Sequence, residues 1–273
     1  MDIKKAEFVQ GFIRLTDDAF KKGWHERNGG NLSYRIKPEE IEEVKDALKP
    51  AKEWISIGVR VPNLAKEYFL VTGTGKYMRN VILCPEDNIA IAKIDDKGEN
   101  YTVSSGGLST VAVRQASFQH TFLNHSIKKD LTKEKVRVIY HAHPTNTIAL
   151  TFVLPLKDKV FTRELWEMAT EDPVIFPEGI GVVPWMVPGG KAIADATGKL
   201  MKKYNVAIWA HHGMFVVGKD FDEAFGLMDT VEKAAEIYIK VCSMGGKKQT
   251  ISSQNFRDLA EEFKITLREE FLD

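Results

Sequence analysis

Two histidines separated by a single residue are the feature of this sequence best suited to chemistry. His141 and His143 come at the end of residues 136–140 (Val-Arg-Val-Ile-Tyr), a run that favours a β-strand. Because alternate side chains of a strand point to the same face, the two imidazoles would lie side by side where the strand ends. Two neutral imidazoles arranged in this way form half of a binding site for zinc or a similar metal.

A second pair of histidines follows another apolar run. Residues 206–210 (Val-Ala-Ile-Trp-Ala) indicate a buried strand, and His211 and His212 come directly after it. The ends of strands in open sheets are where such proteins bind their ligands, so we expect one of these histidines to join the first pair. Strand periodicity does not choose between His211 and His212. The alternative interpretation is that these are hydrogen-bonded core histidines or surface histidines.

Two glycine-rich turns could bind an anion. Residues 28–31 (Asn-Gly-Gly-Asn) form a compact turn whose amides and backbone N–H groups could surround an oxyanion. Residues 73–76 (Gly-Thr-Gly-Lys) form a second turn, without the spacing of a nucleotide-binding loop. Either could be a simple turn, but together with a metal site they suggest a phosphorylated carbonyl substrate.

A carboxylate stands at the start of a proline- and glycine-rich segment. Residues 172–190 contain four prolines and several glycines, and Glu171 directly precedes them. This composition predicts a loop. The loop could bring the Glu171 carboxylate over a site, and a solvent-exposed glutamate is the alternative.

Strands and helices that could position these residues alternate along the chain. Spacing of apolar residues predicts helices at about 6–22, 38–48, 117–126, 191–204, 220–243 and 254–263. Strands are predicted at 68–71, 81–83 and 90–94, and residues 147–154 could be helix or strand. We find no repeat and no linker, so the sequence predicts one α/β domain, residues 1–273, with a sheet covered by helices.

Composition and charge restrict the class of protein. The 273 residues include 44% hydrophobic and 28% charged residues, which is ordinary for a soluble globular protein. A net charge of zero offers no field to attract nucleic acid or an anionic membrane, so an anionic substrate would be captured by local groups. There are two cysteines, no apolar run of roughly 20 residues and no apolar leader at the start. We therefore expect a cytoplasmic protein.

The sequence resembles the class II aldolase/adducin family over nearly its full length, and within it the branch that acts on rhamnulose 1-phosphate. Many short matches occur in the same order. They lie at residues 8–11, 22–24, 26–32, 71–73, 75–76, 79–80, 141–143, 160–163, 176–177, 184–189, 212–213 and 243–246.

This resemblance implies a fold, a reaction and a set of site residues. It implies a central sheet with helices on both faces, a homotetramer with sites between subunits, and cleavage to dihydroxyacetone phosphate and L-lactaldehyde. It selects His212 over His211, so that Zn²⁺ would be held by His141, His143 and His212. The phosphate of the substrate would be bound by five residues, and Glu171 would reach the site of the neighbouring subunit. The five phosphate-binding residues are Asn28, Gly29, Asn31, Thr74 and Gly75.

The chain departs from the family where the family has its proton-transfer base. The family carries a Pro-Thr-Ser-Glu segment, and residues 114–117 here read Arg-Gln-Ala-Ser. Ser117 stands in place of the glutamate, and a neutral hydroxyl is not a general base near neutral pH. No acidic residue occurs between Glu99 and Asp130, so no shift of the alignment restores the carboxylate.

We therefore expect a zinc-dependent aldolase of the rhamnulose-1-phosphate type whose native activity is weakened or redirected. An altered variant could use a different base, and His120, three residues after Ser117, is the candidate on the same helical face. The alternatives are an aldol or retro-aldol activity on another carbonyl substrate, a sugar-phosphate 4-epimerase or fuculose-type aldolase, and a non-enzymatic module like adducin.

Overall fold

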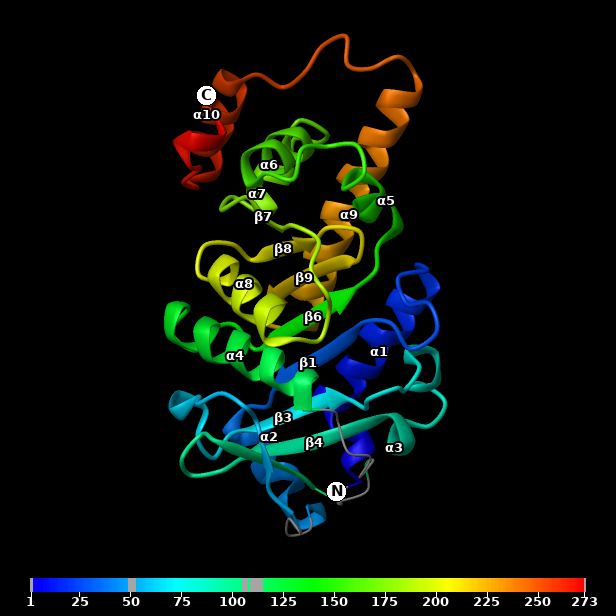
Figure 1. The fold of residues 1–273 in the computed structure, drawn as a ribbon, viewed down its shortest axis with the longest axis vertical. Coiled ribbons are helices and arrows are strands. Elements are labelled where there is room, and N and C mark those ends of the chain that lie inside the picture. The colour runs from blue at the N-terminus through cyan, green and yellow to red at the C-terminus, as the bar shows by residue number, and fades with distance from the viewer. Residues whose placement is uncertain (1, 49–52, 105–107, 109–114, 273) are drawn as a thin grey trace.

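A single mixed sheet forms the centre of the computed structural model, which describes residues 2–48, 53–104, 108 and 115–272, without the side chains of residues 115–118. Within this part of the chain the sheet has nine strands in the order β2-β5-β4-β3-β1-β6-β9-β8-β7 (Figure 1). The strands are β1 (Asn31–Arg35), β2 (Ile55–Ser56), β3 (Tyr68–Thr72), β4 (Ile89–Ile94), β5 (Asn100–Ser104), β6 (Val138–Ala142), β7 (Ile180–Val183), β8 (Val206–Trp209) and β9 (Gly213–Gly218).

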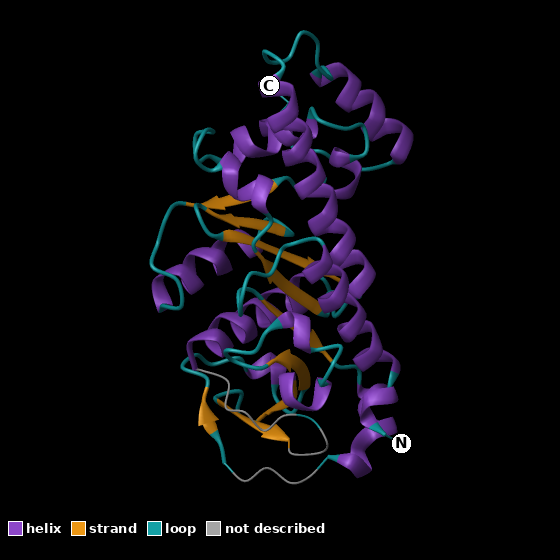
Figure 2. Ribbon diagram, turned by 90° about the vertical axis from the view of Figure 1, so that its right-hand side faces the viewer, coloured by secondary structure: helices purple, strands orange, loops and turns teal. Residues whose placement is uncertain are grey.

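Neighbouring strands of the sheet are antiparallel, apart from β7 and β8, which are parallel. Seen from the side, the strands lie between helices (Figure 2). The longer helices are α1 (Glu7–Lys21), α4 (Gln115–Leu131), α8 (Lys191–Met201), α9 (Phe221–Ser243) and α10 (Ser253–Phe263). The shorter ones are α2 (Pro38–Val44), α3 (Pro85–Asn88), α5 (Thr145–Leu150), α6 (Asp158–Trp166) and α7 (Asp172–Ile175).

Alternate residues of the central strands bury opposite faces of the sheet. Val138 and Tyr140 of β6 belong to the large apolar cluster formed with α1 and α9. Ile139, between them, packs in a separate cluster that includes Ile193 of α8. Removing such side chains from water is worth roughly 1.5–3 kcal/mol each, so the alternation fixes which face β6 turns towards α8. His141 continues the Ile139 face.

Most predicted elements are confirmed, and the α/β sheet with helices on both faces is the observed fold. The segment 147–154, left open from the sequence, begins as helix α5. Residues 172–190, expected to be a loop, include the helix α7 and the strand β7, because β7 pairs with β8. Among the described helices none is long and apolar enough to cross a membrane.

The strand predicted at residues 81–83 is wrong. Local hydrogen bonds close turns there instead, from Val81 N to Met78 O (3.0 Å) and from Leu83 N to Asn80 O (3.2 Å). Val81 is buried but Ile82 and Leu83 are exposed, so this apolar run has no sheet face to cover.

Candidate metal centre and adjoining cavity

Three histidines meet where β6 ends and the β8–β9 hairpin turns. Strand β9 pairs with β6 so that Met214 lies opposite Ala142, which brings the residue before β9 next to the residue after β6. Those two neighbourhoods carry His212 and His143, while His141 is on β6 itself. One ring nitrogen from each of the three histidines lies within 4.8 Å of the others. The antiparallel register thus assembles a three-imidazole group from two segments that are far apart in the sequence.

Gly213 permits the close approach of these rings. A Cβ atom at this position would lie 2.5 Å from the Ala142 carbonyl oxygen and 2.8 Å from Cδ2 of His143. Both distances are shorter than real Cβ contacts, so a larger residue would push the hairpin away from β6. The glycine after His212 is therefore part of the geometry of the histidine group.

Hydrogen bonds on the Nδ1 side orient two of the rings. His141 Nδ1 lies 3.0 Å from the Met214 carbonyl oxygen, and His143 Nδ1 lies 2.6 Å from Oε1 of Glu26. Both partners accept, so each ring carries its proton on Nδ1 and keeps a lone pair on Nε2. Nε2 of His143 is buried and has no hydrogen-bond partner among the described residues. Such an acceptor nitrogen beside two further imidazoles fits a divalent metal with an open coordination position.

Burial and nearby charges favour the neutral form of His141 and His212. Burial, followed by the neighbouring charges of His143 and His212, holds the pKa of His141 well below its usual value. Burial and then His143 also lower the pKa of His212. At Glu26, burial would raise the pKa, but hydrogen bonds from the His143 ring and from the backbone outweigh it and lower the pKa. Neutral imidazoles are the form that binds metal.

A cavity of about 240 Å³ opens beside the histidines. It is lined by the three histidines together with Gly29, Gly30, Asn31, His120, Pro188, Gly189, Gly190, Ile193, Trp209 and Phe215. The cavity is therefore polar at the histidine and glycine side and apolar where Trp209 and Phe215 close it. The rim residues 188–190 come from the loop that precedes α8.

The first predicted turn contributes to this cavity and the second does not line it. Gly29 and Asn31 line the cavity, whereas the Asn28 side chain is exposed. Thr74 and Gly75 follow β3, the strand paired with β1, and Thr72 Oγ1 accepts a hydrogen bond from Leu32 N at 3.2 Å. The first turn precedes β1 and the second follows β3, so both lie at the same end of these two paired strands. Thr74 and Gly75 are nevertheless not among the residues that line the cavity.

A buried histidine supports the first turn from below. His25 is hydrogen-bonded to the Tyr140 hydroxyl (2.8 Å) and to the Gly29 carbonyl oxygen (2.9 Å). Burial lowers the pKa of His25 to about 4, so it is a neutral structural group. Neither His25 nor Glu26 was singled out from the sequence. Their roles depend on contacts with residues more than 100 positions away, and no local sequence pattern predicts such contacts.

The side chains of the adjacent histidines, His211 and His212, point in different directions, and only His212 joins the histidine group. His211 has a left-handed backbone (φ 62°), and its Nδ1 lies 3.1 Å from Oγ1 of Thr151. Its ring packs against Phe152, with ring centroids 4.1 Å apart. His212, by contrast, faces His141 and His143 at centroid distances of 5.2 and 5.0 Å.

Of the two catalytic residues expected from the resemblance, only Glu171 has a described side chain, and it does not line this cavity. Glu171 is exposed at the N-terminal cap of α7. Ser117 lies in the first turn of α4, and its side chain is outside the described part of the structure. His120 does line the cavity, packed against Trp209 and Phe215 at centroid distances of 5.3 and 4.6 Å. Burial lowers the pKa of His120 to about 3, which makes it a weak base at neutral pH.

The chain is similar to proteins of one known family. Residues 10–239 match the family described as Class II Aldolase and Adducin N-terminal domain. The chain is 46% identical to a rhamnulose-1-phosphate aldolase of Mannheimia succiniciproducens over 259 residues, covering 95% of each chain. It is 45% identical to a rhamnulose-1-phosphate aldolase of Escherichia coli O157:H7 over 265 residues, covering 97% of this chain and 96% of the relative.

Solved structures show the same fold at lower identity. A sugar-phosphate aldolase from Thermotoga maritima superposes with a TM-score of 0.73 at 24% identity, covering 88% of this chain and 97% of that one. An L-fuculose-1-phosphate aldolase from Thermus thermophilus superposes with a TM-score of 0.55 at 20% identity, covering 90% of this chain and 100% of that one.

Proposed function

We propose an activity from the premise that this chain belongs to the class II aldolase and adducin family. The proposed reaction is the reversible cleavage of rhamnulose 1-phosphate into dihydroxyacetone phosphate and L-lactaldehyde, with Zn²⁺ at His141, His143 and His212. The relatives at 44–46% identity, which carry the name of this activity, support the substrate class of a phosphorylated sugar. We further propose that the protein acts in the cytoplasm.

One observation carries the proposal of a metal-dependent enzyme over that of an adducin-like module. The three imidazoles are held together, and the buried Nε2 of His143 lacks a partner in the described part of the chain. A buried polar group without a partner costs free energy, so a protein that had lost its chemistry would gain from replacing it. When bound, Zn²⁺ would supply a Lewis acid for the negative charge that forms as the carbon–carbon bond breaks.

The remaining residues would bind and orient the substrate. Gly29 and Asn31 line the cavity beside the histidines and are suited to hold the phosphate. Asn28, Thr74 and Gly75 lie at the same end of the paired strands β1 and β3, and we propose that they also bind the phosphate. The apolar wall of Trp209 and Phe215 would limit the access of water to the reacting carbons.

Proton transfer is the weak step of this proposal. Cleavage requires a base for the hydroxyl proton, and Ser117 replaces the glutamate that the family uses there. General-base catalysis contributes roughly 10²–10⁴-fold, so we propose a slow native reaction. His120 is the internal competitor for the role, and its lowered pKa of about 3 speaks against it.

We also propose a homotetramer with sites between subunits. Glu171 is exposed and outside the cavity of its own chain, which is what a residue serving a neighbouring subunit requires. Light scattering at micromolar concentration tests this proposal, and a monomer that binds a phosphonate analogue tightly would contradict it.

The experiment that tests the function pairs two histidine variants. His143→Ala should lose zinc, measured by elemental analysis of the purified protein, and should lose rhamnulose 1-phosphate cleavage, measured by release of dihydroxyacetone phosphate. His211→Ala is the matched control, because its ring contacts Thr151 and Phe152 instead, and it should keep both. Zinc retained in His143→Ala would refute the metal site.

A further inference from the structure

Among the described residues, Glu26 stands out as the carboxylate in contact with the histidine group. Its Oε1 lies 2.6 Å from Nδ1 of His143, across 117 positions of sequence. The side chain of Glu26 is 65% exposed, while that of His143 is 14% exposed. An ion pair or hydrogen bond so open to water contributes little to folding, about 0–1 kcal/mol. The contact is therefore better explained by what it does to the His143 ring.

The backbone around Glu26 holds His143 at the same time. His143 N donates to the Trp24 carbonyl oxygen (2.9 Å), and Gly29 N donates to the Glu26 carbonyl oxygen (2.8 Å). A Cβ atom at Gly29 would lie 2.8 Å from Cε1 of His143, so the turn approaches the ring closely and leaves no room for a side chain at this position. Residues 24–29 thus enclose the Nδ1 side of the ring, whereas the opposite nitrogen, Nε2, is buried and meets no partner in the described ranges.

We propose that Glu26 is a positioning residue that fixes the proton of His143 on Nδ1 and the plane of its ring, and so presents Nε2 to a divalent metal. A carboxylate behind a ligating imidazole fixes its tautomer and raises its basicity, and loss of such a partner typically weakens metal binding 10–100-fold. The inference rests on the proposed metal site. It adds that the turn which lines the substrate cavity also determines the geometry of one metal ligand.

His141 does not depend on Glu26 in this way. His141 is oriented by the Met214 carbonyl oxygen of the sheet, which is fixed by backbone pairing. Replacing Glu26 should therefore affect the tautomer of His143 and leave that of His141 unchanged.

The test compares variants that change either the length or the charge of the Glu26 side chain. Glu26→Gln keeps an acceptor oxygen at the same reach and removes the charge, Glu26→Asp keeps the charge and shortens the reach, and Glu26→Ala removes both. Glu43→Ala, at an exposed carboxylate of α2, is the matched control. Zn²⁺ affinity is measured by competition with a chelator, and the tautomer of His143 by ¹⁵N NMR of the metal-free, histidine-labelled protein.

We expect Glu26→Ala to weaken Zn²⁺ binding about 10–100-fold and to shift His143 away from the Nδ1–H form. Glu26→Gln should keep the tautomer and bind zinc more tightly than Glu26→Asp, while Glu43→Ala matches the wild type. Wild-type zinc affinity with an unchanged tautomer in both Glu26→Ala and Glu26→Asp would overturn the proposal. Zinc retained by His143→Ala would instead refute the metal site, and the tautomer measurement on metal-free protein would still decide the role of Glu26.

Discussion

Strands β1 and β6 lie side by side, and their two ends have opposite character. At one end Asn31 pairs with His141, and the side chains beyond them surround a cavity. At the other end Arg35 and Arg137 exchange backbone and side-chain hydrogen bonds, with Arg35 N to Arg137 O at 2.8 Å. The same two strands thus carry a group of imidazoles at one end and a group of charged side chains at the other.

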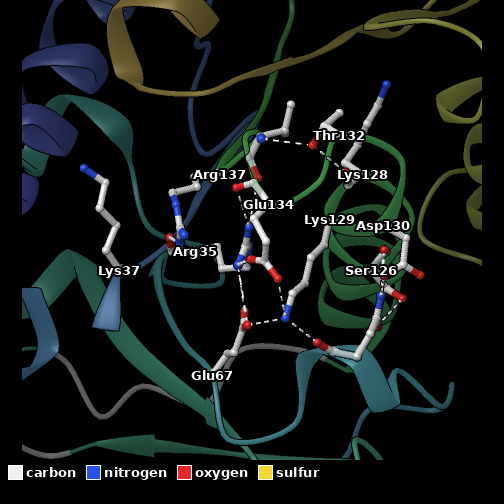
Figure 3. Close-up of polar contacts among 12 residues, drawn as sticks. Arg35, Lys37, Glu67, Ser126, Lys128, Lys129, Asp130, Thr132, Glu134 and Arg137 are labelled. Carbon is white, nitrogen blue, oxygen red and sulfur yellow. Dashed lines mark hydrogen bonds and ion pairs between the residues drawn. The ribbon is translucent and has the colours of Figure 1, made fainter. Parts of the chain in front are cut away.

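The charged end has its partners built into the chain (Figure 3). The Arg35 side chain is 2% exposed and donates to Glu134 Oε2 (2.7 Å) and Glu67 Oε2 (3.2 Å). Lys129 joins the same two carboxylates at 3.1 and 2.5 Å and also donates to the Asn63 carbonyl oxygen. The network ties the turn between α4 and β6 to strand β1.

The difference between the ends separates structure from function. Burying the Arg35 guanidinium is tolerable because carboxylates and carbonyl oxygens meet it, although its Nε lacks a partner among the described residues. At the histidine end, ring nitrogens of three histidines lie within 4.8 Å of one another beside a cavity, and this convergence favours it as the binding end. Variants at the histidine end should therefore change metal binding and activity, whereas variants at the charged end should change stability. Four predictions test this difference.

The largest expected effect is a gain of activity at the histidine end. Ser117→Glu introduces a carboxylate at the position proposed for the missing base, and it should raise rhamnulose 1-phosphate cleavage by up to about 10²–10⁴-fold. The gain will be smaller if the neighbouring residues misplace the carboxylate, since about 1 Å can cost 10²-fold. Steady-state kinetics of the zinc-loaded protein measure the gain.

The companion variant for this measurement is His120→Ala. If it abolishes activity while Ser117→Glu leaves the rate unchanged, the base has moved to His120 and the account of a missing base is wrong. If His120→Ala keeps the wild-type activity and Ser117→Glu gains activity strongly, the account of a missing base is supported.

The second prediction concerns stability at the charged end. Arg35→Met removes the donor to the carbonyl oxygens of Glu134 and Val136, while Lys129 still pairs with the two carboxylates. It should lower the free energy of unfolding by about 1–3 kcal/mol for each carbonyl oxygen left without its donor. Zinc affinity should not change, because the site is at the other end of β1. Urea unfolding and zinc titration measure the two quantities. Arg60→Met is the control, since the Arg60 side chain is 70% exposed and its pair with Glu99 should be worth about 0–1 kcal/mol.

What the sequence could predict of these two ends depends on the range of the contacts. The pairing of His141 with His143 follows from the two-residue period of a strand, so it was predictable from three residues. The meeting with His212 needs the order β6-β9-β8, which no local pattern contains. The sequence predicted ligands at the ends of two strands, and the structure adds that β9 lies between those strands, β6 and β8.

Other parts of the site were beyond reach for the same reason. Glu26 and Arg35 have partners 117 and 99 positions away, so their roles appear only when the sheet is assembled. The false strand at residues 81–83 shows the converse limit, because an apolar run predicts a strand only where a sheet face is available to it. The helices predicted from apolar spacing are confirmed, since that spacing is local, whereas α6 was not predicted.

The third prediction is a pH dependence at the histidine end of metal-free protein. Burial lowers the pKa of His25 to about 4, from an ordinary value of 6.5. The stability it contributes is fully present above pH 6.5 and is lost as the pH falls towards 4, because the unfolded chain binds the proton first. The slope in this range is up to about 1.4 kcal/mol per pH unit for one proton. His25→Gln should reduce the slope measured by urea unfolding between pH 7 and 4, and an unchanged slope would show that His25 does not titrate in this way.

The smallest expected effect is the pH dependence of the charged end. At Glu134, burial would raise the pKa, but hydrogen bonds and charges from Arg35 and Lys129 outweigh it and lower the pKa below its ordinary value of 4.5. The stability from this carboxylate is therefore present above pH 4.5 and is lost as the pH falls through the lower folded value. The Glu134 side chain is 53% exposed, so solvent screening limits its contribution to less than about 1 kcal/mol. Glu134→Gln should leave the curve between pH 7 and 5 parallel to that of the wild type and flatten it slightly below pH 4.5. A change of slope above pH 5 in this variant would mean that the two ends of β1 and β6 do not titrate independently, and the separation between a structural end and a binding end would fail.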